Sequence, residues 1–194
     1  MKKTNTLYNI TEAYNKPYST KQNLEITKEL YPILNGLILG DAGVFKTSPT
    51  SNARVEISFG QRYLSFAEHV AYLLDDFMSN PLKEVKIKHK DKIYINYRIK
   101  TKSLPIFNYF HDLYYYYDED TNRYKKIVPL NICDLMDPVV LAYLIMTDGN
   151  FDKGRNRVRI YTNSFTKKEV ESIAKAIDIQ LGIYVGVLYD RKDQ

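Results

Sequence analysis

The chain has 194 residues, 44% of them hydrophobic, with a formal net charge of +5 and a pI near 9.0. This length predicts one sizeable globular domain or two small ones that share a core, and the positive charge favours a polyanionic partner. Cys133 is the sole cysteine, which excludes an internal disulfide and a multi-cysteine zinc site. No apolar run approaches the roughly 20 residues of a membrane span, and the N-terminus lacks the apolar stretch of a secretory signal, so we expect no membrane partner.

The residue usage indicates the kind of genome. Lys, Asn, Ile and Tyr are abundant, with 18 Tyr and no Trp. This bias is typical of AT-rich coding DNA, such as that of an organelle.

The first regular feature after an expected N-terminal arm, residues 1–25, is one half of an internal repeat. Leu34–Ala42 (LNGLILGDA) aligns with Leu141–Gly149 (LAYLIMTDG), with apolar residues in step and an aspartate eighth in both copies, Asp41 and Asp148. An internal repeat indicates a fold built from like structural units. We therefore predict two related units, residues 26–133 and residues 134–194, each opening with a motif helix.

The residues after each motif helix are also alike. Arg54–Phe59 and Arg157–Thr162 alternate polar and apolar residues as strands do, and Ser65–Val70 and Ser164–Val170 read as the helices that follow. A Ser or Thr is available to cap the second of these helices. Each unit is thus predicted to begin with a helix, a strand pair and a second helix.

Residues 83–102 are predicted to form a long hairpin, because their alternation is unusually regular. Odd positions from Val85 to Ile99 are mostly apolar, and even positions are mostly Lys, Arg and Asn. To keep one parity on one face across the turn, the loop must be odd, and we predict a loop of His89–Asp91 between paired Lys88 and Lys92. The hairpin would then have one apolar and one basic face.

The first unit is predicted to close with helices at residues 105–117 and 132–135. The second unit has only 46 residues after Asp148, and Tyr189–Gln194 reads as the turn before a further strand. We expect this unit to be truncated, without a strand and its closing helices. We expect a fold of the α/β class, of the α+β type, with antiparallel strands in two related units.

The motif helices are open to two interpretations. Their Leu and Ile stripes are typical of a core helix, but small residues such as Gly36 and Gly40 also permit close approach of two helices. Each copy places a carboxylate at the helix C-terminus, where the helix dipole is already negative and a cation such as Mg²⁺ would fit. If the helices pack side by side, Asp41 and Asp148 meet at the bottom of the interface, each facing one strand of a duplex. That arrangement suits metal-assisted phosphodiester hydrolysis; alternatively, either aspartate is a helix-terminal turn residue.

Basic residues recur on the polar parity of the predicted strands. Such a sheet face suits the major groove, with some side chains on phosphates and others able to read base edges. Exposed strands are also often Lys-rich to discourage edge pairing, which is the alternative. The candidate DNA-binding residues are Arg54, Gln61, Arg62, Lys86, Lys88, Lys92, Asn96, Arg98, Lys100, Lys102, Arg155, Arg157, Arg159 and Asn163.

Two other groups of residues carry less weight. His69, His89 and His111 lie on separate predicted elements without ligand-like spacing, so we interpret them as surface or structural residues. The run Tyr114–Tyr117 could stack on bases, but a helix end that leads into the acidic loop Asp118–Asp120 is the favoured interpretation.

At its two motifs the chain resembles the LAGLIDADG homing endonucleases, in the single-chain, two-motif form encoded within organellar introns. Both motifs keep the eighth-position acid, and the flanks GLILGDAGV, LAYLIMTDGNF and TNSFTKKEVE resemble the branch with the mitochondrial intron endonucleases. The resemblance runs from about Glu25 to the end of the chain. It implies an αββαββα unit used twice, motif helices at a pseudo-twofold interface, saddle-shaped sheets on DNA, a staggered double-strand break made with Mg²⁺, and a mitochondrial location.

The resemblance also assigns a lysine. That branch has a lysine near a Lys-Lys-x-x-Pro stretch, which Lys125–Pro129 matches here, so Lys126 inherits a role in organising water or stabilising the scissile phosphate. Its alternative is a solvated loop lysine. The sixth motif positions, Leu39 and Met146, depart from an acidic residue. The partner lysine of the second active site would lie in the missing region.

Three functions remain open from the sequence. The leading one is a site-specific double-stranded DNA endonuclease acting in intron homing, as a monomer with internal pseudo-symmetry. The second is an RNA-binding maturase that assists splicing of its own intron, and the third is an inactive DNA-binding fragment. Both aspartates are intact, which favours cleavage.

Overall fold

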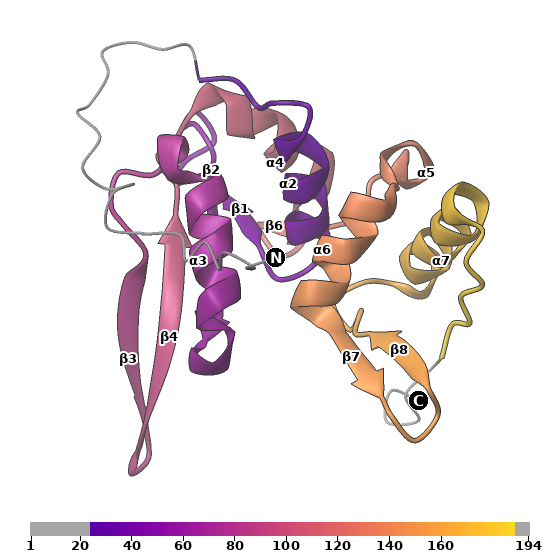
Figure 1. The fold of residues 1–194 in the computed structure, drawn as a ribbon. Helices are drawn as coiled ribbons and strands as arrows, with labels where there is room; N and C mark the ends of the chain where they lie inside the picture. The colour runs from indigo at the N-terminus through magenta and orange to yellow at the C-terminus, as the bar shows by residue number, and fades with distance from the viewer. Residues whose placement is uncertain (1–23, 189–194) are drawn as a thin grey trace, which may run out of the picture.

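The structure is a computed structural model that describes residues 24–188. Most of the predicted N-terminal arm and the predicted turn Tyr189–Gln194 lie outside the described residues. Two lobes flank a central pair of helices, and the fold class is the expected mixture of helices and antiparallel sheets (Figure 1). Within residues 24–188 no helix is long and apolar enough to cross a membrane.

The central pair consists of the two predicted motif helices, α2 (Leu30–Leu39) and α6 (Pro138–Asp148), which pack along one another. The Leu and Ile stripe of α2 is fully buried, as expected for a core helix. Glycine permits the close approach: a Cβ on Gly36 would lie 2.6 Å from the Val140 carbonyl oxygen and 2.7 Å from Tyr143 Cβ. The repeat in the sequence therefore corresponds to two helices packed so closely that any residue larger than glycine at position 36 would clash with α6.

The first lobe holds a four-stranded antiparallel sheet in the order β1-β2-β4-β3. Its strands are β1 (Gly43–Phe45), β2 (Arg54–Gly60), β3 (Lys83–His89) and β4 (Lys92–Lys100). The short 3₁₀ turn η1 (Gln61–Tyr63) leads from β2 into α3 (Leu64–Leu73), and η2 (Asp75–Phe77) follows α3. Ala67, Val70 and Ala71 of α3 are buried with Val55 and Ile57 of β2 in the core. The predicted strand, helix and hairpin are all present.

The register of the β3–β4 hairpin differs from the prediction. His89 pairs with Lys92, so the loop is the two-residue turn Lys90–Asp91, and Lys90 has a positive φ of 53°. With a loop of even length, residues that pair across the two strands have unlike parity. The even-numbered residues of β3 and those of β4 therefore lie on opposite faces of the sheet. The predicted single basic face is therefore wrong.

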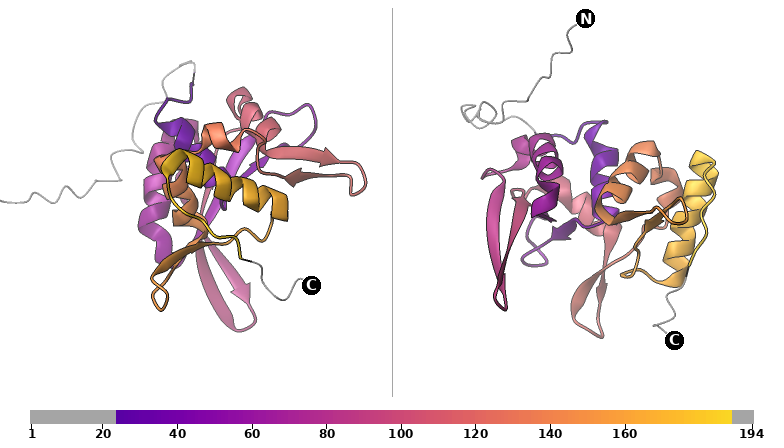
Figure 2. Two further views of the ribbon diagram at one scale, coloured as in Figure 1. Left: turned by 90° about the vertical axis from the view of Figure 1, so that its right-hand side faces the viewer. Right: turned by 60° about the horizontal axis from the view of Figure 1, so that its bottom comes forward.

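The helix predicted at residues 105–117 is shorter and ends in a hairpin. A 3₁₀ turn, η3 (Pro105–Phe107), leads into α4 (Asn108–Tyr114), and then β5 (Tyr115–Asp118) pairs with β6 (Arg123–Lys126). The consecutive tyrosines favour a strand, since aromatic residues pack well on a pleated surface, and Asn122 accepts the positive φ of the turn. Figure 2 shows this hairpin projecting away from the β3–β4 hairpin.

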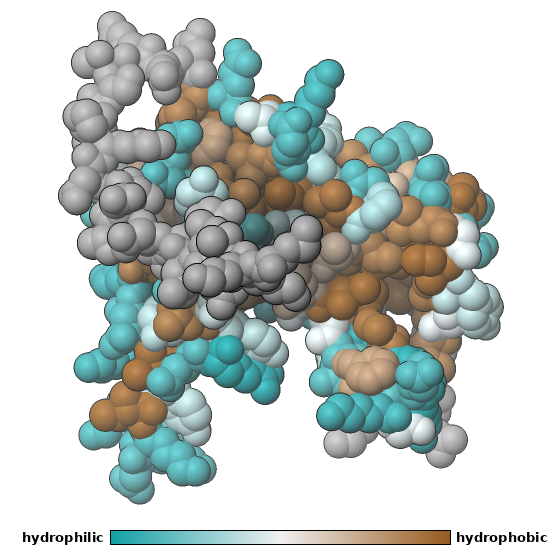
Figure 3. Space-filling view, viewed as in Figure 1, coloured by the Kyte–Doolittle hydropathy of each residue, from teal (hydrophilic) through white to brown (hydrophobic). Residues whose placement is uncertain are grey.

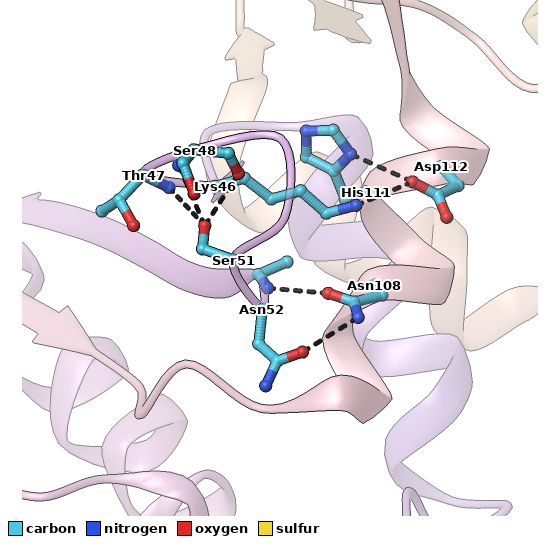
Figure 4. A network of polar contacts seen from close by, with 9 residues as sticks. Lys46, Thr47, Ser48, Ser51, Asn52, Asn108, His111 and Asp112 are labelled. Atoms are coloured by element: carbon cyan, nitrogen blue, oxygen red, sulfur yellow. Dashed lines mark hydrogen bonds and ion pairs between the residues drawn. The ribbon is translucent and has the colours of Figure 1, made fainter.

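The loop between β1 and β2 is fixed to α4 by a polar network (Figure 4). Lys46 Nζ lies 3.2 Å from Asp112 Oδ1, and Asn108 Oδ1 accepts a hydrogen bond of 2.8 Å from the Ala53 amide. His111 is buried, stacks on Tyr115 with ring centroids 5.3 Å apart, and lies 3.2 Å from the same Asp112 oxygen. Burial lowers the pKa of His111, which makes it a neutral structural residue at pH 7.

The second lobe follows α6 with β7 (Gly149–Asp152), β8 (Arg157–Ile160) and α7 (Lys167–Leu181), as the repeat predicted. Thr166 and Glu169 form a capping box at the start of α7, and Gly182 ends the helix with a φ of 66°. The short helix α5 (Ile132–Leu135) packs against α7. The predicted boundary between the units, after Cys133, falls within α5 and stays a prediction.

Candidate active site and nucleic-acid interface

The two motif aspartates lie at the same end of the central helix pair. Asp148 is the last residue of α6, and Asp41 follows α2 directly after the C-cap residue Gly40. Asp148 Oδ2 lies 3.0 Å from the point where a Cβ on Gly40 would be, so the second carboxylate lies against the end of the first helix. Asp41 is exposed and Asp148 is half-buried. The sequence prediction that this packing would bring the two acids together agrees with this geometry.

The electrostatics of the pair disfavour two negative charges. Burial raises the pKa of Asp148 to about 7, with further contributions from the charge of Asp41 and a hydrogen bond with it. The two carboxylates share a site, and this site lies at the negative ends of two helix dipoles. Ionisation of both carboxylates therefore costs free energy. A cation between them would remove that cost, so the donor set fits a hard divalent metal ion.

Lys126 is the third member of this site. It is the last residue of β6, and its Nζ donates to the carbonyl oxygens of Gly40 at 2.6 Å and Ala42 at 3.2 Å, which flank Asp41. Burial lowers its pKa to about 8, against the charges of Asp148 and Asp41, which raise it. The alternative of a solvated loop lysine does not agree with these contacts, because the amino group is buried and bonded to the end of α2.

The protein supplies few ligands to a metal ion here. Within residues 24–188 no group of three or more His, Cys, Asp or Glu side chains could hold a metal ion. An ion held by Asp41 and Asp148 would therefore need water and substrate oxygens to complete its coordination, which is how Mg²⁺ is commonly bound.

Half of the predicted DNA-binding residues of the first lobe share one face of the sheet, which we call the first polar face. The pairs Glu56–Lys100, Ser58–Arg98 and Gly60–Asn96 place β2 and β4 residues on it. Arg54 and Lys92 share this parity. Lys86 and Lys88 pair with Ile95 and Ile93 and therefore lie on the opposite face, contrary to the prediction.

Three further candidates of the first lobe lie outside the strands. Gln61 and Arg62 are exposed in η1, where the Arg62 guanidinium lies 4.6 Å from the Tyr63 ring centroid. Lys102 follows β4, and its Nζ lies 3.4 Å from the Asp76 carbonyl oxygen. The predicted strand parity does not apply to Arg62 or Lys102.

The second lobe has a corresponding surface on β7 and β8, which we call the second polar face. Asp152 pairs with Arg157 and Asn150 with Arg159, and these four residues share a face. Arg155 lies in the turn between the strands, not in a strand as predicted, and Asn163 is exposed after β8. A hollow of about 470 Å³ beside Asp152 is lined by Asn150, Lys153, Arg155 and Arg159, among others.

Sequence reasoning missed two acidic residues at the centres of these faces. Glu56 lies on the first polar face among Arg54, Arg98 and Lys100, and Asp152 lies on the second among Arg155, Arg157 and Arg159. The alternation Arg-x-Glu in β2 was a signal for Glu56, because it places the acid on the same face as Arg54. No comparable signal marked Asp152, whose partners come from the next strand and turn.

In both lobes a strand begins close to the end of a motif helix. β1 begins two residues after Asp41, and β7 begins directly after Asp148. The β3–β4 and β7–β8 hairpins extend toward the same side, and hydrophilic side chains dominate the ends of both lobes there (Figures 1 and 3). The two acids therefore lie at the end of the helix pair, between the two lobes that carry these polar faces.

Comparison with known proteins decides the family. The family model described as the LAGLIDADG DNA endonuclease family matches residues 31–194, which include both aspartate motifs and both polar faces. The chain belongs to this family.

Two relatives of this LAGLIDADG protein have different named activities. The chain is 27% identical over 165 residues to the cytochrome b mRNA maturase bI2 of Debaryomyces hansenii. This match covers 83% of the chain and 60% of the maturase. It is 25% identical over 166 residues to the DNA endonuclease I-ChuI of Chlamydomonas applanata, which covers 79% of this chain and 73% of the endonuclease. The chain thus spans about three fifths of the maturase relative's length.

A solved structure has the same fold. The homing endonuclease I-WcaI, bound to its DNA recognition sequence, superposes with a TM-score of 0.75 at 20% identity, covering 94% of this LAGLIDADG chain and 84% of that one. The predicted fold class and family resemblance are both confirmed.

Proposed function

We propose that this LAGLIDADG protein is a site-specific endonuclease that hydrolyses both strands of double-stranded DNA with Mg²⁺ in intron homing. The observation that carries the proposal is the convergence of Asp41 and Asp148 at the C-terminal ends of the packed helices α2 and α6, between the two lobes. The endonuclease relative and the fold of a DNA-bound homing endonuclease support it.

The proposed roles follow from the geometry. Asp41 and Asp148 would hold the Mg²⁺, which when bound supplies positive charge near the scissile phosphates and lowers the pKa of water. The Lys126 amino group is hydrogen-bonded to both carbonyls that flank Asp41. It would stabilise the negative charge of the reacting phosphate or donate a proton beside it. The two polar faces would hold the duplex on either side, and one chain with two units would suffice as a monomer.

The test is cleavage of a plasmid that carries the ligated exons of the host gene. The junction of these exons is the intron insertion site. The unmodified chain should linearise this plasmid in Mg²⁺ and leave it intact in EDTA, and a plasmid that carries the intron should resist. Equal cutting of both plasmids, or cutting in EDTA, would contradict the proposal.

The second candidate function is that of an RNA maturase, which the cytochrome b mRNA maturase relative favours. The same basic surfaces could hold intron RNA. A splicing assay with the double variant Asp41→Asn, Asp148→Asn separates the two functions: splicing retained by a protein that no longer cuts DNA would establish the maturase. The maturase relative and the AT-rich residue usage support our proposal that the gene is mitochondrial.

A further inference from the structure

Each polar face has a carboxylate at its centre that binds three basic side chains. Glu56 accepts from Arg54 Nε at 2.6 Å and from Arg98 Nη2, and its Oε1 lies 3.6 Å from Lys100 Nζ. We call this the Glu56 cluster. Asp152 Oδ2 lies 3.0 Å from Arg159 Nη2, 3.4 Å from Arg155 Nη1 and 3.5 Å from Arg157 Nε. We call this the Asp152 cluster.

Both carboxylates are ionised at neutral pH. Burial would raise the pKa of Glu56, but hydrogen bonds from Arg54 and Arg98 outweigh it and hold the pKa below its usual value. The pKa of Asp152 is likewise low, because the arginines offset the effect of burial. Each cluster therefore keeps a fixed negative charge among its cations.

A fixed carboxylate is unsuited to a surface that only binds phosphate. It repels a phosphate group and removes one of the three positive charges, so it would weaken a purely electrostatic contact. Lys92 on the first polar face differs, since within the described residues it forms no ion pair, and it suits phosphate better. The clusters and Lys92 thus have different chemistry.

The clusters do suit the edge of a G·C pair in the major groove. Guanine presents two acceptors, O6 and N7, to the fork of an arginine, and cytosine presents an amino donor to a carboxylate. Arg98 and Arg155 each bond the carboxylate through one terminal nitrogen and keep the rest of the guanidinium open, with side chains 50% and 66% exposed. The carboxylate fixes each arginine before binding, which lowers the entropy cost of recognition.

We propose that Glu56 and Asp152 position Arg98 and Arg155 to read guanine, so that the target carries one selected G·C pair in each half. Arg98 and Arg155 contact the base, and the two acids are positioning residues. This inference rests on the proposed function, because it requires that the polar faces meet double-stranded DNA.

The test is selection from a randomised duplex library, followed by affinity measurements over a range of salt concentrations. Arg98→Lys keeps the charge but loses the fork. It should reduce the preference for G at one position in one half about tenfold or more, and leave the salt dependence unchanged. Arg155→Lys should do the same in the other half. The matched control Lys92→Gln should weaken all sequences alike and lower the salt slope by about one.

The positioning role has its own variant. Glu56→Gln should relax the same position as Arg98→Lys and steepen the salt dependence, because the cations lose their internal counter-charge. Since Glu56 is buried, thermal unfolding checks that this variant folds; the half-exposed Arg98 provides the test if it does not.

Four results would overturn the inference. Uniform loss of affinity in Arg98→Lys and Arg155→Lys would show phosphate contacts. Unchanged base preference in a folded Glu56→Gln protein would remove the positioning role. A selected target without G at these positions would also contradict it while leaving the endonuclease proposal intact, whereas an unmodified chain that selects no sequence would overturn both.

Discussion

Asp148 imposes a cost on the folded protein in the absence of metal. Burial, the charge of Asp41 and the hydrogen bond with it raise the pKa of Asp148 to about 7, above the unfolded value near 3.8. At pH values between these two pKa values, the folded chain binds a proton that the unfolded chain has released. The contribution of Asp148 to stability therefore decreases as the pH rises from about 4 to about 7.

Asp148→Asn should remove this cost, because the amide resembles the protonated acid. In EDTA the variant should match the unmodified protein near pH 4 and exceed its free energy of unfolding at pH 8 by about 1 kcal/mol, a value discounted because the side chain is only half-buried. Urea unfolding at the two pH values measures this difference. A variant that is less stable at pH 8 than at pH 4, relative to the unmodified chain, would contradict the account of the pair.

Lys126 links β6 to the end of α2, so its amino group has a structural effect as well as a chemical one. Lys126→Met would leave the carbonyls of Gly40 and Ala42 without their donor and should lower the free energy of unfolding by about 1–3 kcal/mol. Its neighbour Lys125 has a half-exposed side chain that pairs with Asp118, so Lys125→Met should lower the free energy of unfolding by less than Lys126→Met. Equal losses in the two variants, measured by urea unfolding, would argue against a buried role for Lys126.

These residues show what a sequence can reveal at this scale. The proximity of Asp41 and Asp148 was predictable because a repeat marks both, and Lys126 was a candidate because a family resemblance marks it; their catalytic roles stay predictions. Glu56 and Asp152 were missed, since an acid among basic residues looks like ordinary surface until the register of the strands is known. Lys86 and Lys88 were misplaced for the same reason.

At the scale of elements, glycine at Gly36 sets the distance between α2 and α6. A Cβ there would lie 2.6 Å from a backbone oxygen of α6, which no side-chain rotation relieves. Gly36→Ala should therefore lower the free energy of unfolding by about 2 kcal/mol or more. Gly60 is the matched control, because a Cβ there meets nothing within 4 Å.

Thermal unfolding of Gly36→Ala and Gly60→Ala tests the close packing. If Gly36→Ala were as stable as Gly60→Ala, the two motif helices would not approach as described. A third variant localises the effect: a Cβ on Gly40 would overlap the Thr147 side chain, so Gly40→Ala should be rescued in part by Thr147→Gly.

The positions of most elements followed from residue patterns, but their pairing did not. The alternation in residues 83–100 is compatible with a loop of two or three residues, and only the turn geometry at Lys90 decides between them. Residues 115–117 of β5 were predicted as the end of a helix, because a tyrosine run has no period of its own and its partner strand lies beyond an acidic turn. Long-range pairing decides such cases.

At the scale of the whole molecule, the internal repeat predicted the arrangement best. It required two like helices, and the structure packs α2 along α6 with a strand pair after each. The repeat does not fix where the first unit ends. α5 lies at the predicted boundary yet packs against α7 of the second unit, so the two units share a core and not only an interface.

The most direct test of the paired aspartates is strand-resolved cleavage of a duplex that carries the insertion site, labelled on either strand. In Mg²⁺ the unmodified chain should cut both strands, and Asp41→Asn and Asp148→Asn should each reduce double-strand cleavage to background. The control Asp112→Asn alters an acid that lies on α4 beside Lys46 and His111, and should still cut. Cleavage of both strands at the unmodified rate by Asp41→Asn and Asp148→Asn would contradict the assignment of the site.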